Sequence, residues 1–355
     1  MKKILVIQQK MIGDVLASSI LCNNLRQIYP KAQIHYLIYP FTKPVVENNP
    51  NIDSCVLYED SYKKSSLKRL QFLYRIRKER YNMVIDAYNK PESFLVTMAS
   101  GADVKIGFFK KYSQKLYHFN IAPIDKPLTN AGTALENRIN LLSCVAPNFK
   151  FDLRPKIWLT TSEKEEAQNT LQKHGILESD PFLVIGILGS DESKSYPAPY
   201  MAQVLDFLAA NTSSKLVLNY MPKQANEVQT ICALCAPETR SRIISELVPT
   251  NIRAFLALTH FSQALIGNEG GAVNMAKALG IKTFTIFSTW IIKEAWNSFE
   301  DGSNHVSVHL QDYKPELYGD KTAKQMKKNA LPLYQAFTPD LILPELEAFL
   351  NRLKN

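Results

Sequence analysis

The sequence has no hydrophobic run long enough to span a bilayer. Its longest apolar stretch, residues 182–188, is interrupted by Gly186, whereas a transmembrane helix needs about 20 apolar residues. The apolar residues 4–7 follow two lysines but end at the polar Gln8, so they lack the form of a secretory signal. We therefore expect a cytoplasmic protein without a membrane-spanning segment.

Cysteine, glycine and histidine are also scarce. The five cysteines are an odd number, and the isolated Cys232-Ala-Leu-Cys235 is better explained by two apolar positions on a helix than by redox or metal chemistry. The 13 glycines form no G-x-G-x-x-G, G-x-S-x-G or Walker pattern, so the usual dinucleotide, hydrolase and P-loop signatures are absent. The six histidines have no metal-ligand spacing. We expect no bound metal and no resident cofactor.

What the sequence does contain is an alternation of strand-like and helix-like patterns. In the first part of the chain this alternation predicts a parallel sheet covered by helices on both faces. The predicted strands are 3–8, 33–39, 55–58 and 83–87, and the predicted helices are 14–28, 66–79, 92–100 and 134–144.

The alternation restarts after residues 151–155. Ser162 and Glu165 have the spacing of a capping box at the start of a helix. Strands are predicted at 182–188, 215–220, 242–245, 264–267 and 283–287, and helices at 200–210, 225–236, 251–259, 272–279 and 339–353. A chain of 355 residues is expected to form two domains. We expect domains at 1–155 and 156–335, followed by a C-terminal helix within 336–355 whose apolar side must dock.

Charge is distributed unevenly. Residues 1–155 hold 23 Lys and Arg against 12 Asp and Glu, whereas residues 156–355 hold 19 against 21. Positive charge is densest in residues 61–80, and a second basic and aromatic stretch spans 105–115. These stretches indicate either a solvated helix face with a basic loop, or a surface for an anionic partner such as acidic lipid, phosphorylated glycan or nucleic acid.

Three turns follow predicted strands, where ligands bind in doubly wound sheets. The first is 8–14, with a single glycine and with Asp14 where a helix N-cap belongs; Asp14 fits either a cap or a catalytic base. Lys10 in the same turn could pair with Asp14 or with a phosphate.

The second turn is 188–197, where Ser190, Ser193 and Lys194 supply hydroxyls and a cation that suit a phosphate. An exposed polar loop is the alternative interpretation.

The third turn begins at residue 267. Gly270 and Gly271 open a helix directly after a strand, so its first N–H groups form an anion site suited to a diphosphate, unless the glycines serve only close packing. Glu269 could accept bonds from a ribose hydroxyl. Trp290 and Trp296 further on either stack on a base or pack in the interior.

Together these turns resemble the family 9 glycosyltransferases, the bacterial heptosyltransferases of lipopolysaccharide assembly. The resemblance rests on the order and spacing of five segments along nearly the whole chain. They are Ile12-Gly-Asp-Val-Leu16, Leu25-Arg-Gln-Ile-Tyr-Pro30, Val104-Lys-Ile-Gly-Phe108, residues 190–197 with Lys194, and residues 267–280. The resemblance implies an α/β protein of GT-B type, with two Rossmann-like domains facing a cleft and a C-terminal helix returning to the first domain.

The resemblance also implies a reaction. It is an inverting, metal-independent transfer of heptose from ADP-heptose to an acidic, lipid-linked lipopolysaccharide core sugar at the cytoplasmic face of the inner membrane. Asp14 matches the family's catalytic base. The donor-binding residues would be Ser190, Lys194, Glu269, Gly270, Gly271 and Asn274, and the acceptor-binding residues Lys10, Lys63, Lys64, Lys105, Lys110 and Lys111.

Two other functions are compatible with the sequence. A sugar-nucleotide epimerase shares the two-domain layout and would convert its substrate without an acceptor. A basic, non-catalytic module would bind anionic membrane or nucleic acid with a steep salt dependence. Because no nucleic-acid-binding motif is present, we do not expect a nucleic-acid partner.

Overall fold

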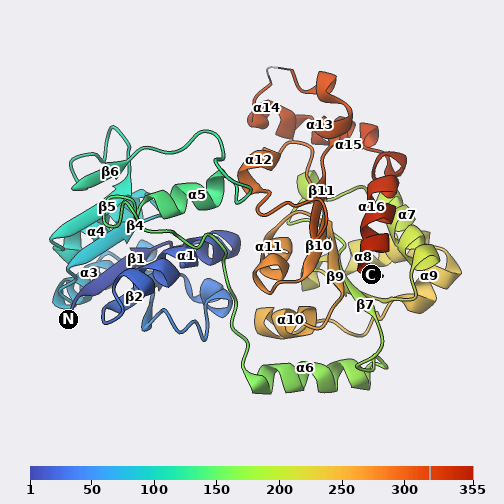
Figure 1. The fold of residues 1–355 in the computed structure, drawn as a ribbon, viewed down its shortest axis with the longest axis horizontal. Helices are drawn as coiled ribbons and strands as arrows, with labels where there is room; N and C mark the ends of the chain where they lie inside the picture. The colour runs from blue at the N-terminus through green and yellow to red at the C-terminus, as the bar shows by residue number, and fades with distance from the viewer. Residues whose placement is uncertain (320, 355) are drawn as a thin grey trace. The chain divides into compact units, whose positions relative to one another are not determined.

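The computed structural model describes residues 1–319 and 321–354. The chain divides into two compact units, Met1–Trp158 and Leu159–Asn355, where the sequence predicted a boundary between residues 155 and 156. Each unit contains one parallel sheet (Figure 1). None of the helices in the described ranges combines the length and apolar character needed to cross a bilayer.

The first unit is built on a six-stranded sheet in the order β3-β2-β1-β4-β5-β6. Its strands are β1 (Lys3–Ile7), β2 (Gln33–Ile38), β3 (Ser54–Leu57), β4 (Met83–Asp86), β5 (Val104–Phe108) and β6 (Phe119–Ile121). Its α-helices are α1 (Ile12–Ile28), α2 (Ser61–Lys64), α3 (Ser66–Lys78), α4 (Pro91–Ser100) and α5 (Thr133–Asn140). The sequence analysis did not predict β5 and β6, which lie at one edge of the sheet.

Helices cover both faces of the first sheet. Leu37 of β2 packs in one core cluster with Phe72 and Ile76 of α3. The adjacent Tyr36 donates its hydroxyl to the Val15 carbonyl of α1 at 2.7 Å. Because successive side chains of a strand point to opposite faces, α1 and α3 lie on opposite sides of the sheet. This double coverage explains why residues 4–7 of the central strand β1 are all apolar.

The second unit is built on a five-stranded sheet in the order β11-β10-β9-β7-β8. Its strands are β7 (Phe182–Gly186), β8 (Lys215–Asn219), β9 (Ala264–Asn268), β10 (Lys282–Ile286) and β11 (His305–Val308). Its α-helices are α6 (Thr161–Lys173), α7 (Ala198–Asn211), α8 (Ala225–Leu234), α9 (Pro237–Arg242), α10 (Ile252–Thr259), α11 (Gly271–Ala278), α12 (Lys293–Trp296), α13 (Leu310–Tyr313), α14 (Ala323–Lys328), α15 (Ala330–Ala336) and α16 (Pro339–Leu353).

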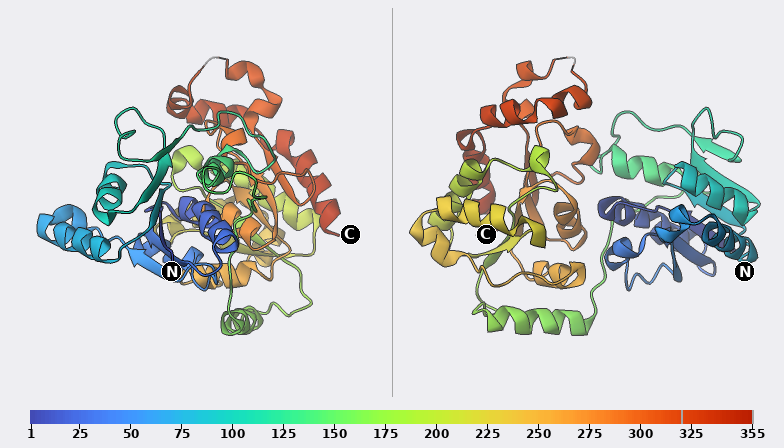
Figure 2. Two further views of the ribbon diagram at one scale, coloured as in Figure 1. Left: turned by 60° about the vertical axis from the view of Figure 1, so that its left-hand side comes forward. Right: turned by 180° about the vertical axis from the view of Figure 1, so that it is seen from behind.

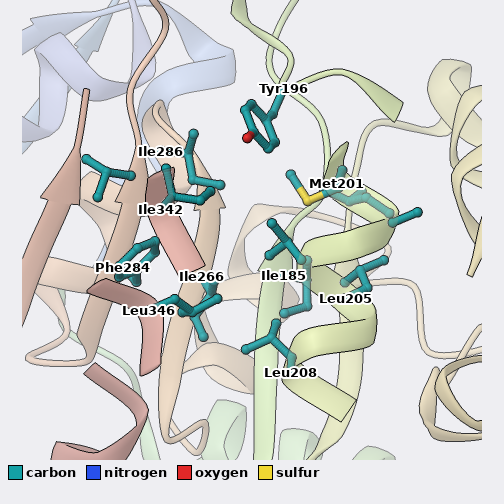
Figure 3. Packing of buried hydrophobic residues seen from close by; sticks show 14 of the residues in the cluster. Ile185, Tyr196, Met201, Leu205, Leu208, Ile266, Phe284, Ile286, Ile342 and Leu346 are labelled. Carbon is teal, nitrogen blue, oxygen red and sulfur yellow. The ribbon is translucent and has the colours of Figure 1, made fainter. Parts of the chain in front are cut away.

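The core of the second unit lies between one face of this sheet and two helices, α7 and α16 (Figure 3). The helices contribute apolar side chains spaced three and four residues apart, which form one stripe on each helix. Among the packed residues are Ile185, Ile266, Phe284 and Ile286 from the strands, Met201, Leu205 and Leu208 from α7, and Ile342 and Leu346 from α16.

The C-terminal helix is where the structure departs from the expected domain arrangement. We expected it to pack on the first domain, but α16 packs against α7 and β11 of the second unit. Leu346 and Phe349 are fully buried there. The expectation that this helix returns to the first domain is therefore wrong, because the apolar side that needed a docking place is covered within its own unit.

Two local predictions also need correction. The capping box at the start of α6 is formed by Thr160 and Glu163, two residues before the predicted pair. Residues 242–245 do not form a strand: Ile243 makes only an isolated bridge to Leu216, directly after α9. In both places the residue types fit the prediction, but the hydrogen-bond partners decide the outcome.

Candidate functional sites

In both sheets the chain reverses direction across the sheet at one point. In the first unit this point lies between the neighbouring strands β1 and β4, and in the second unit between β7 and β9. Ligands of doubly wound sheets bind beyond the carboxyl ends of the strands at such points. The three turns singled out in the sequence follow β1, β7 and β9, so each candidate site lies where the topology favours one.

Asp14 lies in the first turn of α1, three residues after the N-cap residue Met11. It is therefore not the N-cap itself, although its Oδ2 atom accepts the Met11 N–H at 3.3 Å. Its Oδ1 atom accepts a hydrogen bond from Arg138 Nη2 at 2.5 Å. The Asp14 side chain keeps 27% of its surface exposed, against 12% for Arg138, so the carboxylate is held in place and still reachable.

Arg138 is itself fixed by several partners. Its Nε donates to Ser18 Oγ at 2.7 Å and its Nη1 to the Ala134 carbonyl at 2.6 Å. Ser18 in turn donates to Gln8 Oε1 at 3.2 Å. The sequence analysis missed Arg138, because a single arginine in a short helix carries no local signal of a partner 124 residues away.

Two of the predicted acceptor lysines meet over one aromatic ring beside this turn. The ammonium groups of Lys10 and Lys63 lie 5.0 and 5.5 Å from the ring centroid of Tyr39. Lys63 also pairs with Glu92 at the start of α4, at 3.2 Å. The Tyr39 hydroxyl and the Glu92 carboxylate raise the pKa of Lys63 above its usual value. The Lys63 ammonium therefore carries charge at neutral pH, and it lies with Lys10 at the carboxyl edge of the sheet.

A third predicted lysine, Lys110, lies at the same edge and is tied to a buried polar group. Its ammonium donates to the Asn89 carbonyl at 2.7 Å. The Asp86 carboxylate, fully buried at the end of β4, accepts the Asn89 N–H at 2.8 Å and the Tyr117 hydroxyl at 2.8 Å. Burial raises the pKa of Asp86. This network fixes the loop that presents Lys110.

Of the other three predicted acceptor lysines, Lys105 lies away from this edge. Lys105 is the second residue of β5, in register with Val84, and therefore lies toward the amino end of the strand. Lys64 and Lys111 are exposed at the surface. The structure thus assembles Lys10, Lys63 and Lys110, and separates Lys105 from them.

In the second unit, the loop after β7 is organised by Asp191, which the sequence analysis did not single out. Its carboxylate accepts the hydroxyls of Ser193, at 2.6 Å, and Ser190, at 3.3 Å. The Ser193 hydrogen bond, together with the charges of Lys327 and Lys194, holds the pKa of Asp191 below its usual value. Both serine hydroxyls expected to meet a phosphate therefore bind this aspartate instead.

The two predicted donor-side turns come together through Lys194 and Glu269, whose Nζ and Oε1 atoms lie 3.2 Å apart. Ser288, which follows shortly after the end of β10, donates its hydroxyl to the same Oε1 atom at 3.0 Å. The side chains are largely covered, with 24% of Lys194 and 11% of Glu269 exposed. Because Glu269 directly precedes Gly270, this pair places the Lys194 ammonium beside the start of α11.

The two strand ends are held together by Asn268. Its Nδ2 donates to the carbonyls of Gly186 and Ile187, both at 3.0 Å, and its Oδ1 accepts the Tyr196 N–H at 2.7 Å. Gly267 lets the strands approach this closely, since a Cβ there would lie 2.3 Å from the Gly186 oxygen. Asn268 and Gly267 therefore fix the position of the Lys194 loop relative to α11.

The start of α11 is open. Gly270 has φ of +152°, and a Cβ on Gly270 or Gly271 would meet no atom within 4 Å. The first N–H groups of a helix have no partner within the helix and carry its positive dipole end. Asn274, half-buried one turn further, donates its N–H to the Gly270 carbonyl at 3.3 Å. The arrangement of an open helix start beside Lys194 suits an anion.

A second cation lies near this site. Lys327 of α14 lies 4.6 Å from the centroid of the Trp290 ring, and Lys194 lies 5.5 Å from it. The Trp290 indole N–H donates to the Ser193 carbonyl at 2.8 Å. Trp290 therefore braces the Lys194 loop. Lys327 was not singled out in the sequence, because α14 lies far from the three turns along the chain.

No cluster of three or more His, Cys, Asp or Glu side chains in residues 1–319 and 321–354 is arranged to hold a metal ion. His309 is the N-cap of α13. Its Nε2 lies 3.1 Å from the Ser288 carbonyl and its Nδ1 accepts the Gln311 N–H at 3.1 Å. The imidazole therefore supports the Ser288 segment, whose hydroxyl binds Glu269.

Comparison with known proteins identifies relatives over most of the chain. Residues 69–325 match the family model described as Glycosyltransferase family 9 (heptosyltransferase). Lipopolysaccharide heptosyltransferase 1 of Campylobacter coli is 21% identical over 290 residues, which cover 80% of this chain and 83% of that protein.

Two solved structures with the same fold are a glycosyl transferase family 9 protein and a heptosyltransferase. The glycosyl transferase family 9 protein from Veillonella parvula has a TM-score of 0.76 at 17% identity, covering 94% of this chain and 97% of that one. Escherichia coli ADP-heptose lipopolysaccharide heptosyltransferase II has a TM-score of 0.67 at 18% identity, covering 94% and 99%. These matches confirm the expected fold class, with two Rossmann-like sheets of GT-B type.

Proposed function

The chain belongs to glycosyltransferase family 9, and on this premise we propose that it transfers heptose from ADP-heptose to an acidic, lipid-linked sugar of the lipopolysaccharide core. The protein is a glycosyltransferase, and its heptosyltransferase relatives imply a nucleotide-sugar donor and a glycan acceptor. Family membership sets aside the epimerase and the non-catalytic module. The identity of the donor and of the acceptor is our proposal.

The observation that carries the proposal is the Asp14 carboxylate, held by Arg138 at the carboxyl end of β1 and still partly exposed. In an inverting transfer, the acceptor hydroxyl oxygen attacks the anomeric carbon from the side opposite the leaving group. As the new C–O bond forms, Asp14 takes the hydroxyl proton. The bond between the anomeric carbon and the diphosphate oxygen breaks, and the nucleoside diphosphate leaves with the electron pair.

The leaving diphosphate gains negative charge, which the second unit is built to stabilise. Lys194 supplies a cation beside the start of α11, and Gly270 and Gly271 leave the first N–H groups of that helix open. Prearranged donors of this kind lower the barrier because they need no reorganisation during the reaction. We therefore propose that the transfer needs no divalent metal and no cofactor. Glu269 and Asn274 complete the proposed donor-binding set, whereas the Ser190 hydroxyl, which was predicted to join it, donates to Asp191.

On the acceptor side, Lys10, Lys63 and Lys110 give the carboxyl edge of the first sheet a positive charge near Asp14. Phosphate groups on the acceptor would bind there. Since such an acceptor is anchored in the inner membrane, we propose that the protein works in the cytoplasm at that membrane's anionic surface.

The proposal is tested with purified protein, ADP-heptose and a lipid-linked core acceptor. We expect transfer that continues in the presence of a chelator and is abolished in Asp14→Asn. A shift in melting temperature with ADP, but not with UDP, GDP or CDP, identifies the donor nucleotide; a ligand at about 100 times its dissociation constant stabilises by about 2.7 kcal/mol. Full turnover by Asp14→Asn would refute the assigned base, and stabilisation by another nucleotide would refute ADP-heptose.

A further inference from the structure

Helix α3 has one buried and one exposed apolar side. Phe72 and Ile76 pack into the core of the first unit, whereas Leu67, Leu70 and Tyr74 are 67%, 62% and 61% exposed. Leu70 follows Leu67 by three residues and Tyr74 follows Leu70 by four, so these exposed side chains share one face of the helix. We refer to Leu67, Leu70 and Tyr74 as the α3 apolar face. The left view of Figure 2 shows this helix, in light blue, on the outside of the first unit.

Exposed apolar side chains continue onto helix α4, which packs against α3, and onto the loop after β5, whose Tyr112 contacts Phe94 of α4. Helix α4 exposes Leu95 and Met98, and the loop after β5 exposes Phe109 and Tyr112. In the described residues, thirteen exposed large apolar side chains lie in the first unit and six in the second. Single exposed apolar residues are ordinary, but a concentration of them marks an interaction surface.

The charge around the α3 apolar face is positive. Lys64, Lys68 and Lys78 are exposed on or next to the helix, and Lys78 Nζ lies 4.6 Å from the Tyr74 ring centroid. The nearest acidic residue in the sequence, Glu79, is paired with Lys3. The apolar face is therefore bordered by cations whose charge is not cancelled within the segment.

We propose that the α3 apolar face inserts into the headgroup region of an anionic lipid bilayer, with Lys64, Lys68 and Lys78 binding lipid phosphates. A helix with apolar residues on one side and lysines beside them lies in the plane of such an interface. Its cations are attracted by anionic lipid, and tyrosine suits the boundary between apolar and wet surroundings. The biological setting rests on the proposed function, because a lipid-linked acceptor lies in a membrane.

Two other occupants fit this face less well. A second copy of the chain would bring two sets of lysines together in a symmetric interface, where like charges repel. A nucleic acid would bind the lysines but would leave Leu67 and Leu70 without apolar partners. Of these three occupants, a lipid surface is the one that meets the positive charge and the exposed leucines at the same time.

The test is co-sedimentation of the full-length protein with phosphatidylcholine vesicles, with and without phosphatidylglycerol. We expect binding to the anionic vesicles only, decreasing with salt. Leu67→Ser combined with Leu70→Ser removes apolar surface that the fold does not bury, and we expect binding at least about tenfold weaker. Lys64→Glu combined with Lys68→Glu should weaken binding at least about tenfold as well.

Matched controls distinguish binding through the α3 apolar face from nonspecific hydrophobic adsorption and from the effect of net charge. Leu177→Ser with Leu234→Ser changes two exposed leucines of the second unit, and Lys31→Glu with Lys126→Glu changes two exposed lysines elsewhere in the first unit. Both controls should bind vesicles like the wild type.

Three results would overturn the proposal: equal binding to neutral vesicles, unchanged binding by both α3 variants, or self-association that the α3 leucine variant abolishes. Melting temperature with nucleotide, measured on the same variants without lipid, should not change. Vesicle binding without glycosyl transfer would refute the proposed function but not this inference. Transfer to a soluble acceptor without vesicle binding would refute this inference but not the proposed function.

Discussion

Arg138 Nη2 donates a hydrogen bond to Asp14 Oδ1 at 2.5 Å, and so joins the first turn of α1 to α5. The same guanidinium binds Ser18 of α1 and the Ala134 carbonyl. An arginine fork held at three points fixes the direction in which the carboxylate faces. We assign Arg138 as a positioning residue for the proposed base.

The first prediction concerns this pair. Arg138→Ala should lower kcat by about 10²-fold with little change in KM for the donor, because a misplaced base costs rate rather than donor binding. Arg138→Lys should recover part of the activity and retain a single charge, and the profile of kcat against pH should differ between the two variants. A change confined to melting temperature, with kcat intact, would show that Arg138 is only structural.

The second prediction concerns the two cations beside Trp290. Lys194→Ala should weaken nucleoside diphosphate binding by roughly 10- to 100-fold, the value of a charge-assisted hydrogen bond. Lys327→Ala should have a smaller effect in the same direction, because Lys327 lies against Trp290 and Asp191 instead of against Glu269. Calorimetric titration measures both, with the exposed Lys173→Ala as the control. Wild-type affinity in Lys194→Ala would remove Lys194 from the donor site.

The third prediction concerns the close approach of β7 and β9. Gly267→Ala should destabilise the second unit by about 3 kcal/mol or more, because φ is +139° and the new Cβ would clash with the Gly186 oxygen. Gly302→Ala also has positive φ but meets no atom, so about 1–2 kcal/mol is expected. Denaturant unfolding gives both values, and equal losses would show that backbone strain alone matters.

The fourth prediction concerns α16. Leu346→Ala should cost about 2–5 kcal/mol, the usual penalty for a buried leucine, and lower the melting temperature of the second unit. Glu347→Ala, next to it on the exposed side, should change stability by less than about 0.5 kcal/mol. If both variants were neutral, the packing of α16 on α7 would be wrong.

The fifth prediction concerns pH. Burial lowers the pKa of His309, so the unfolded chain takes up its proton at a higher pH than the folded one. Above the pKa of histidine in the unfolded chain, about 6.5, His309 is neutral in both states and its full contribution to the free energy of unfolding is present. This contribution decreases as the pH falls from that value toward the lower pKa of His309 in the folded protein. The stability difference between wild type and His309→Gln should therefore shrink from pH 7.5 to pH 5.5. The exposed His118→Gln gives the background, and a constant difference for His309→Gln would contradict the prediction.

Much of this protein follows from local sequence. The apolar residues 4–7 of β1 and 182–185 of β7, together with the helix-spaced apolar residues that follow them, predict two doubly wound sheets. Local signals also show that Asp14, Lys194 and Gly270 follow strands, because each lies within a few residues of a strand end.

Other features needed the tertiary structure. Asp14 and its partner Arg138 are more than 120 residues apart, and so are Lys194 and Lys327, which lie near the same Trp290 ring. No local rule links either pair. The serines of the 188–197 loop were expected to meet a phosphate, but Asp191 within the loop takes their hydroxyls. The docking of α16 was assigned to the wrong unit for a related reason.

The sequence by itself therefore determined the alternation of strands and helices, the positions of the turns after the strands and the uneven distribution of charge. The tertiary structure alone decided which side chains meet at those turns, where α16 packs and which side of α3 stays exposed. The physical reason is that periodicity reports only that a side of a helix is apolar. Whether that side is buried, and against which partner, depends on contacts between segments far apart in the chain.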